Sequence, residues 1–468
     1  MKKIFVKKNI LLFILLFLVV GVSLSFWRES IGRSIALAVL MSIPLIVYIF
    51  TENLVTSLLY FLLLALPFNI TYQLPFPFEK SLVDGISVNY LIPTLSILDF
   101  GLGVLFLTIV TKKLQTLKEV FTKYRYSMLL FLFFLLVQNL ILRNPLVLLS
   151  SLRILLYVNT FLIFLELWQK EKKKLNYNLL SILLLVTVLF QGIIGLFQFL
   201  KGSSLGLDFL GESRGVAGLV GSSFVGLGGQ VFLRAGGTFP HPNMLGGFFL
   251  LVLLFAIFLT KKLQNYYKIV TYLVILFSSI FLIFTFSRTS IFLSFLILTV
   301  LFISKIFFKK KYFSFSFLLI FERFFAIFSG DDSGWIDRVN LAKASFVVIK
   351  QNWISGIGLG NYVKGMEGFF PTTYRSMPLL QPVHNVFLLL FAELGVFGFL
   401  SYTYLLFEIV RKNYKKITIY GILIFISLFV IGMFDHYFVS LPQGQMMFFL
   451  LAFLLLAESQ ENLKYKKK

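Results

Sequence analysis

The feature that most constrains this chain is the recurrence of long apolar runs. Stretches near or above the roughly 18 to 20 residues that cross a bilayer as a helix follow one another along the 468 residues. Composition agrees, because 58% of the residues are hydrophobic and only 13% are charged, too few to cover a water-soluble globule. Helices satisfy their own backbone polar groups within lipid, so the sequence predicts an all-α polytopic membrane protein.

The apolar runs predict about 12–14 transmembrane helices in a single integral membrane domain over residues 1–468. The first run follows the lysine-rich stretch MKKIFVKKN without a convincing small-residue cleavage site, so we expect a retained helix. Three runs are short or interrupted by charge and are alternatively re-entrant or interfacial: 54–67, 312–328 and 444–458. The candidate spans are 10–27, 31–50, 54–67, 86–110, 126–142, 146–168, 178–200, 243–260, 268–287, 290–308, 312–328, 384–409, 417–437 and 444–458.

The basic residues predict how the chain is oriented in the membrane. The formal net charge is +23, yet the lysines lie in short clusters between apolar runs rather than over one face, which argues against a nucleic-acid partner. With these spans every cluster falls on one side, which the positive-inside rule makes cytoplasmic. We therefore expect a multi-pass protein of the cytoplasmic (inner or plasma) membrane with both termini inside. Two long connections, 201–242 and 329–383, then face outward, where long loops are usually functional.

The chain contains three histidines, and each lies at the predicted outer end of a span. They are His241 in FPHPN, His384 in QPVHN and His436 in FDHYF. One alternative is that they are ordinary loop residues, and the other is that a shared outward cavity gathers them. The sequence has no cysteine, no HExxH motif and no clustered outer carboxylates, so thiolate chemistry is excluded and no metal site is predicted.

Several arginines also lie in or near the outward connections, whereas most of the inside charge is lysine. They include Arg234, Arg288 in TFSRTS and Arg338 in WIDRVN. A guanidinium binds phosphate oxygens through a planar fork and keeps its charge at low dielectric. These arginines are therefore candidates for binding a phosphate group, although Arg288 could instead extend toward the lipid headgroups.

Four segments carry a distinctive set of motifs: RAGGTFPHPNMLGG (234–247), TFSRTS (285–290), DRVNLAKASFVVIKQNWISGIGLGNY (337–362) and HNVFLLLFAELGVFGFL (384–400). Together they resemble the O-antigen ligase and O-antigen polymerase family of polytopic envelope proteins. The resemblance covers about residues 230–440, with FDHYFVSLPQGQ as weaker support. One departure is Ile354, which stands where the pattern of this family has proline.

The resemblance implies a GT-C-like fold and an inverting, metal-independent glycosyltransferase without a cofactor. Its donor would be a glycan on undecaprenyl diphosphate and its acceptor a second glycan, both at the membrane lipid surface. Motif by motif, the implied roles are His384 as the catalytic base, Arg288, Arg338 and Arg234 as diphosphate-binding residues, and His241, Asn243, Asn385 and His436 as residues lining the site.

The chemistry of these residue types agrees with that reaction. A diphosphate is already a good leaving group, so the enzyme must chiefly remove the acceptor proton and stabilise the departing charge. A neutral histidine does the first near neutral pH, and fixed arginines do the second without a metal ion. One base without a partner carboxylate nucleophile fits inversion. Glu393, nine residues after His384, is expected on the opposite helix face in a structural role.

Three functions remain as alternatives. A polymerase would join lipid-linked repeats, with a chain-length regulator as a possible partner, and the breadth of the family favours this reading. A ligase would move a finished glycan to a lipid, protein or wall acceptor. A flippase or transporter is the third, but transporters place ionisable groups near the bilayer midplane, whereas here the polar groups gather at one predicted face.

Overall fold

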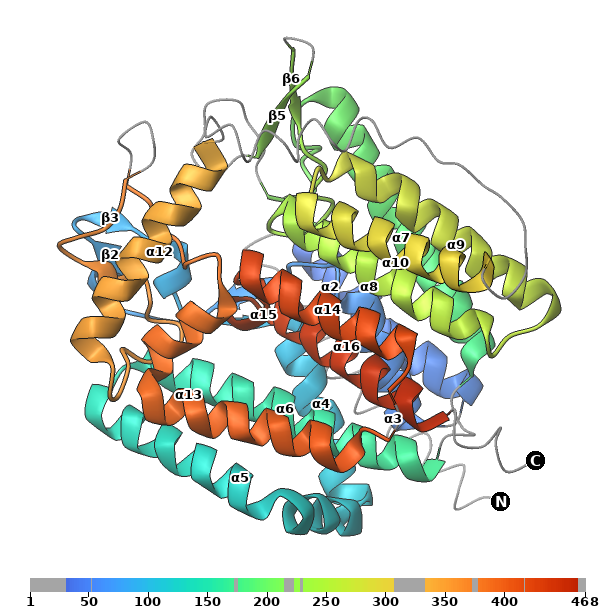
Figure 1. Ribbon diagram of the computed structural model, residues 1–468, viewed down its shortest axis with the longest axis horizontal. Helices are drawn as coiled ribbons and strands as arrows, with labels where there is room; N and C mark the ends of the chain where they lie inside the picture. Colours follow the sequence, from blue (N-terminus) through green and yellow to red (C-terminus); the bar gives the residue numbers. More distant parts are fainter. Residues whose placement is uncertain are drawn as a thin grey trace. The chain divides into compact units, whose positions relative to one another are not determined.

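Helices make up most of the chain in the computed structural model (Figure 1). The predicted spans 10–27 and 312–328 fall outside the residues that the structure describes. The described residues are 31–51, 53–171, 176–213, 223–227, 230–306, 333–372, 378–415 and 417–461.

The helices α6 to α10 follow the predicted spans closely, whereas α5 begins twelve residues before the predicted start at 126 and α12 lies within the predicted connection 329–383. The described helices are α2 (Ile31–Thr51), α3 (Leu54–Ala65), α4 (Ile97–Lys112), α5 (Leu114–Leu142), α6 (Pro145–Glu171), α7 (Tyr177–Lys201), α8 (Pro242–Thr260), α9 (Asn265–Phe284), α10 (Arg288–Ile306), α12 (Ser333–Asn352), α13 (Val386–Asn413), α14 (Ile419–Phe434), α15 (Tyr437–Ser440) and α16 (Pro442–Glu461). Short 3₁₀ turns include η1 (Phe78–Ser81), η2 (Asn89–Leu91) and η5 (Lys364–Met366).

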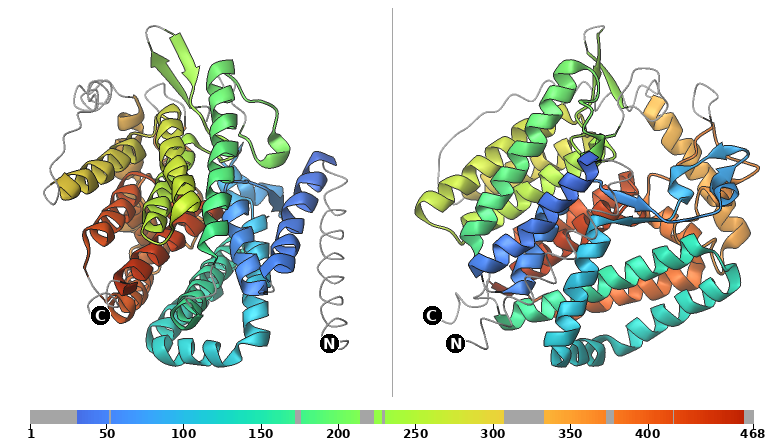
Figure 2. Two further views of the ribbon diagram at one scale, coloured as in Figure 1. Left: turned by 90° about the vertical axis from the view of Figure 1, so that its right-hand side faces the viewer. Right: turned by 180° about the vertical axis from the view of Figure 1, so that it is seen from behind.

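The strands are short and form three two-stranded pairs. β1 (Thr71–Gln73) pairs with β4 (Thr94–Ser96), and β2 (Leu82–Val83) pairs with β3 (Ile86–Ser87). β5 (Phe224–Leu227) and β6 (Gln230–Leu233) form an antiparallel hairpin, which projects beyond the end of α7 (Figure 2). None of these pairs builds a layer, so the helices define the fold.

Six of the described helices are long and apolar enough to cross a membrane: α5, α6, α7, α8, α9 and α13. Shorter apolar helices accompany them at α3, α4, α10, α14 and α16. The predicted class, an all-α polytopic membrane protein, is confirmed. The two long connections carry structure of their own, since the first contains the β5–β6 hairpin and the second contains α12.

The predicted span 86–110 is wrong in its first part, because α4 begins only at Ile97. Ser96 and Asp99 form a capping box there: Ser96 Oγ accepts the backbone N–H of Asp99 at 3.1 Å, and Asp99 Oδ2 accepts that of Ser96 at 2.9 Å. The apolar residues before it serve another purpose, since Val88 and Leu91 are buried in a separate core. Capping and packing therefore make the helix begin at Ile97, although the apolar run in the sequence begins earlier.

The chain divides into two compact units, each assembled from separated stretches of sequence. The first consists of residues 1–72, 95–117 and 163–287, and the second of residues 73–94, 118–162 and 288–468. This division does not test the expected single membrane domain, which stays a prediction.

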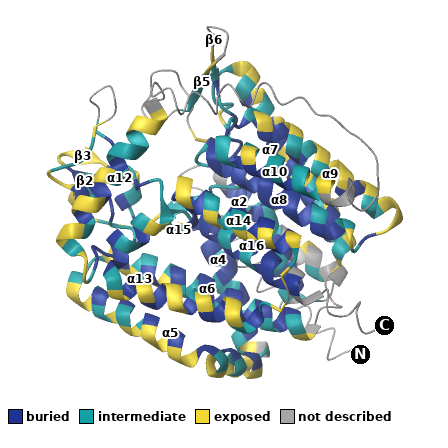
Figure 3. Ribbon diagram, in the orientation of Figure 1, coloured by how far each residue is buried: buried dark blue, intermediate teal, exposed yellow. Residues whose placement is uncertain are grey.

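In the first unit α7, α8 and α9 lie side by side, and α3 packs against α2 and α4 (Figure 1). Helix α8 is buried on almost every side, as its dark ribbon in Figure 3 shows. In a membrane, close van der Waals packing against neighbouring helices stabilises such a helix, because lipid is as apolar as its side chains. The loop that leads into α8 is consequently fixed to a rigid element.

In the second unit α13 packs against α12, α14, α15 and α16, and α14 also contacts α10. One face of α5 is exposed and apolar, with Phe133 at 66% and Leu140 at 73% exposure (Figure 3). Exposed apolar side chains on a spanning helix are expected where lipid covers it. The ends of α13 and α14 in this unit position the site described next.

Candidate active site

His384 lies in the connection that leads into α13, one residue before the cap of this helix. The cap is Asn385, whose Oδ1 accepts the backbone N–H of Leu388 at 3.0 Å. Asn385 Nδ2 donates to the carbonyl oxygen of Met433 at 3.2 Å, near the end of α14. Asn385 therefore caps one helix and ties it to the next, which brings the residues before α13 beside those after α14.

The residues after α14 are Asp435 and His436, and both lie against His384. Nδ1 of His384 is 3.7 Å from Oδ1 of Asp435, and the two side chains are 15% and 12% exposed. This Nδ1 atom is buried and has no hydrogen-bond partner among the described residues. A separation of 3.7 Å is longer than a hydrogen bond, but catalytic pairs commonly tighten when substrate binds. The geometry suits a carboxylate that orients an imidazole.

His436 completes the cluster and is more deeply buried than His384. The two rings meet edge to face with centroids 4.9 Å apart, and His436 is only 4% exposed. Its Nδ1 is 2.6 Å from Oγ of Ser440. Burial and the neighbouring His384 lower the pKa of His436 to about 3, against the opposing effect of Asp435. His436 is thus neutral at physiological pH, which leaves His384 as the candidate base.

Tyr90 in η2 lies on the other side of His436. Its ring meets that of His436 edge to face, with centroids 5.9 Å apart. Burial and the charge of Asp435 raise the pKa of Tyr90 to about 12. The phenol therefore keeps its proton at neutral pH.

A buried apolar core supports these residues. Val88 and Leu91 flank Tyr90, while Val383 immediately precedes His384, and all three belong to the core. The rest comes from α12, from residues 357–366 and from the start of α13. Side chains packed at crystalline density leave little freedom to the connections above them, so the core fixes where His384 lies.

The glycine-rich turn GIGLGN is docked into a break in α13. The break is at Gly395, whose φ of 63° lies in the left-handed region, and a Cβ there would be 2.4 Å from the carbonyl oxygen of Ile354. The carbonyl oxygen of Glu393, released by the break, accepts the N–H of Gly358 at 2.9 Å and Nε2 of Gln138 at 2.8 Å. The glycines of this turn therefore serve close backbone packing.

The side chain of Glu393 faces the same turn. Glu393 is 3% exposed, and its carboxylate accepts backbone N–H groups of Gly360 and Tyr362. These contacts match the structural role expected for Glu393 from its position along the helix.

A second polar cluster lies in the first unit, around the RAGGTFPHPN segment. His241 is the N-cap of α8: its Nδ1 accepts the backbone N–H of Asn243 at 3.1 Å, and its Nε2 is 3.1 Å from Oγ of Ser223. Arg234 donates to Oδ1 of Asn243 at 2.6 Å and to the carbonyl oxygen of Thr285 at 2.9 Å. His241 is thereby a structural cap, and Arg234 is held against the TFSRTS segment.

Two glutamines on α7 clamp the turn between Arg234 and His241. Oε1 of Gln198 accepts the N–H groups of Gly236 and Gly237 at 3.0 and 2.8 Å, and Oε1 of Gln191 accepts that of Thr238 at 3.0 Å. Gly237 has a φ of 59°, and a Cβ there would be 2.4 Å from Oε1 of Gln191. The turn is therefore fixed by buried side chains of a spanning helix.

The remaining predicted residues lie on helices of the second unit. Arg288 is the first residue of α10, which packs against α14, and Arg338 lies near the start of α12, which packs against α13. Phe286, two residues before Arg288, has a φ of 49°, an uncommon backbone conformation for a bulky side chain. The diphosphate-binding roles of Arg288, Arg338 and Arg234 stay predictions.

The structure brings together a ligand set that the sequence analysis does not predict. His384, Asp435 and His436 each offer one metal-ligand atom, and these atoms all lie within 4.8 Å of one another. No zinc-binding motif marks this cluster, because its members come from opposite ends of two spans. The expectation of no metal site stays a prediction.

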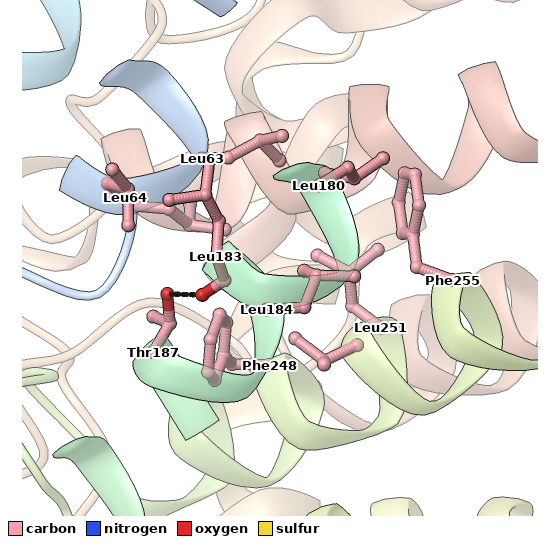
Figure 4. A pocket seen from close by; sticks show the side chains of 11 residues that line it. Leu63, Leu64, Leu180, Leu183, Leu184, Thr187, Phe248, Leu251 and Phe255 are labelled. Carbon is pink, nitrogen blue, oxygen red and sulfur yellow. Dashed lines mark hydrogen bonds between the residues drawn. The ribbon is translucent and has the colours of Figure 1, made fainter. Parts of the chain in front are cut away.

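One apolar cavity is present in the first unit, between α3, α7 and α8 (Figure 4). Leucine and phenylalanine side chains line most of it, and the hydroxyl of Thr187 donates a hydrogen bond to the carbonyl oxygen of Leu183 at 2.6 Å. Its volume is about 10 Å³, roughly the space of a single water molecule. This cavity is too small for a lipid chain and contributes no reactive group.

Asp435 and Tyr90 are the site residues that the sequence analysis misses. Asp435 is adjacent to His436 in FDHYF, so a carboxylate beside a boundary histidine is the signal that could have found it. Tyr90 carries no such signal, since it falls in an apolar run and reaches His436 only through the tertiary fold.

The fold and this cluster define an integral membrane protein with a candidate histidine–carboxylate pair at the ends of two apolar helices. Residues 244–403 match the family model described as O-antigen ligase, so this stretch is similar to that family. The match supports a glycan-processing function for this membrane protein. His384, Arg288 and Arg338 lie inside the matched residues, whereas Asp435 lies beyond them. No curated protein matches the chain.

Proposed function

We propose that this protein is a membrane glycosyltransferase of the GT-C type, which transfers a glycan from undecaprenyl diphosphate to a hydroxyl of an acceptor glycan. The observation that carries the proposal is the buried Nδ1 of His384 beside the carboxylate of Asp435, 3.7 Å away. The match of residues 244–403 to the O-antigen ligase family supports the glycan substrate.

His384 acts as the general base in this reaction. With its Nδ1–H directed at Asp435, the imidazole presents the lone pair of Nε2 to the acceptor hydroxyl. The proton moves to Nε2 as the acceptor oxygen attacks the anomeric carbon, and Asp435 stabilises the imidazolium that forms. A positioned base of this kind accelerates proton transfer by about 10²–10⁴-fold.

The glycosyl bond that breaks is the one between the anomeric carbon and the phosphate oxygen. Its electron pair leaves with undecaprenyl diphosphate, and a single displacement inverts the anomeric configuration. We assign the stabilisation of the departing charge to Arg288 and Arg338, with Arg234 as a third candidate. Arginines carry this charge without a metal ion, so the proposed mechanism needs none.

A polymerase is our first reading of the acceptor, and a ligase is the second. In the first, the acceptor is the growing lipid-linked chain, and a partner protein could set its length. In the second, the acceptor is a lipid, protein or wall polymer, which the description of the matching family favours. The chemistry at His384 is the same in both, because only the bearer of the hydroxyl differs.

We propose that the reaction takes place on the outward face of the cytoplasmic membrane. The lysine clusters all fall on one side of the predicted spans, which the positive-inside rule makes cytoplasmic. His384, Asp435 and His436 fall on the other side, at the ends of α13 and α14. A lipid-linked donor that has already crossed the membrane would meet them there.

The test uses the purified full chain in detergent with a lipid-linked oligosaccharide donor and a chelator present. We expect release of undecaprenyl diphosphate, a product with inverted anomeric configuration, and a ladder of lengthened chains if the protein is a polymerase. A single addition to a foreign acceptor would identify a ligase. Retained configuration, or activity abolished by the chelator, would contradict the mechanism.

A further inference from the structure

The His384, Asp435 and His436 cluster offers two imidazole nitrogens and one carboxylate oxygen, all within 4.8 Å of one another. Two histidines and one carboxylate are a common ligand set for Zn²⁺, whereas Mg²⁺ and Ca²⁺ prefer oxygen ligands alone. Ligands of tetrahedral zinc lie about 3.4 Å apart, given bonds near 2.1 Å. The 3.7 Å separation between His384 and Asp435 is already close to that value.

The hydrogen bonds around the cluster leave it suited to a cation. Nδ1 of His436 is occupied by Ser440, so this ring would use Nε2, as zinc-bound histidines usually use one nitrogen and fix the other. Nδ1 of His384 has no hydrogen-bond partner among the described residues. A buried polar atom without a partner destabilises the fold, and a cation bound between these groups would remove that cost.

The composition of the chain leaves few competing sites. There is no cysteine, and the third histidine, His241, uses both ring nitrogens within its own cap.

We infer that His384, Asp435 and His436 form a binding site for Zn²⁺, and that an occupied site blocks glycan transfer. The inhibition rests on the proposed function, while the binding does not. Zinc on either nitrogen of His384 takes up a lone pair, and the proton of the neutral ring is then on the other nitrogen. No lone pair is left to accept the proton of the acceptor hydroxyl, so the base is lost.

The test measures Zn²⁺ binding to the metal-free full chain in detergent by competition with a chromophoric chelator. We expect one tight site in the wild type and at least tenfold weaker binding in the Asp435→Asn and His384→Ala variants. His241→Asn is the matched control, because it removes the remaining histidine and keeps a good helix cap. Its zinc affinity is expected to equal that of the wild type. Cobalt in place of zinc provides a visible absorption spectrum that reports the ligand set independently of folding yield.

Activity is then measured on the same samples. We expect one equivalent of zinc to abolish glycan transfer and a chelator to restore it. An absence of tight binding, or equal binding in the Asp435→Asn variant, would overturn the site. Zinc bound at the cluster without loss of activity would overturn the inhibition. A chain that binds zinc here but transfers no glycan under any condition would instead refute the proposed function and leave the site intact.

Discussion

Two histidines stand at the start of apolar helices in this protein, and their surroundings differ. His241 is itself the N-cap of α8, with one ring nitrogen bonded to the backbone and the other to Ser223. His384 precedes the N-cap of α13, because Asn385 takes that position. The imidazole of His384 is therefore released from capping and meets the carboxylate of Asp435.

The difference shows how one position along the chain separates a histidine that caps a helix from one whose ring meets a carboxylate. In FPHPN the proline after His241 begins the helix, so the histidine must satisfy the first backbone N–H groups. In PVHNV the asparagine does this, and the histidine before it keeps its hydrogen-bonding capacity for other groups. Both motifs place a histidine at a span boundary, yet only the second leaves one available for catalysis.

The most direct way to break this comparison is to remove each ring. We expect His384→Ala to reduce glycan transfer by about 10²–10⁴-fold, because the acceptor proton loses its base. His241→Asn should keep most of the activity, since asparagine is among the best N-caps. The measurement is the initial rate of chain extension from a lipid-linked donor, normalised to folded protein. Equal losses in the two variants would remove the distinction.

Replacing Asp435 by asparagine tests how the reactive histidine is positioned. The change keeps the shape but removes the charge that stabilises the imidazolium, and we expect a loss of roughly 10–100-fold in kcat with little change in KM. The same substitution in the His384→Ala background should cost nothing further, because the carboxylate acts through that ring. Additive losses would show that Asp435 works by another route.

The arrangement of spans is largely predictable from the sequence, for a simple physical reason. Apolar runs bounded by charge leave the chain few choices in lipid, and α6 to α9 begin and end near their predicted positions. The start of α4 is not predictable from hydropathy, because the Ser96 and Asp99 capping box and the burial of Val88 decide it. Local hydrogen bonds thus decide where the helix begins, which the mean hydropathy of the apolar run does not.

The candidate site is only half predictable. The three histidines stand out because they are rare and lie at span boundaries. The pairing of His384 with Asp435 is not visible in the sequence. It depends on the hydrogen bond from Asn385 to Met433 and on the packing of α13 with α14. Sequence motifs report residue types, whereas the distance between two spans is a property of the packed helices.

The glycine turns of the two units provide a second comparison, this time of stability. Gln198 holds the turn before His241, and Gln138 holds the turn docked into α13 through the carbonyl oxygens of Ser355 and Glu393. We expect Gln198→Ala to destabilise the fold by about 2–4 kcal/mol, because it leaves two buried N–H groups unsatisfied. Gln138→Ala should destabilise the fold less, because it leaves only carbonyl oxygens without this hydrogen-bond donor. The readout is the Tm of each variant in one detergent, and the reverse order would contradict this account.

Lowering the pH tests the burial of the neutral imidazole of His436. The folded protein holds the pKa of His436 near 3, below its ordinary value of 6.5, so the unfolded chain binds this proton more readily. The contribution of His436 to the free energy of unfolding is therefore constant well above pH 6.5. It falls as the pH drops toward 3, by about 2 kcal/mol at pH 5. His436→Gln should flatten the dependence of Tm on pH between 7 and 5. An unchanged slope would mean that other groups cause the loss.

The smallest expected effect concerns Asn385, which caps α13 in place of His384. Asn385→Ala removes both the cap of α13 and the bond to Met433, and we expect a loss of about 1 kcal/mol in stability. Asn385→Asp keeps the capping oxygen but has no N–H to donate to Met433. If that bond is what sets His384 beside Asp435, the aspartate variant should be as stable as the wild type and yet transfer glycan more slowly. An aspartate variant with full activity would show that the packing of α13 against α14 alone fixes the distance, and that Asn385 is only a cap.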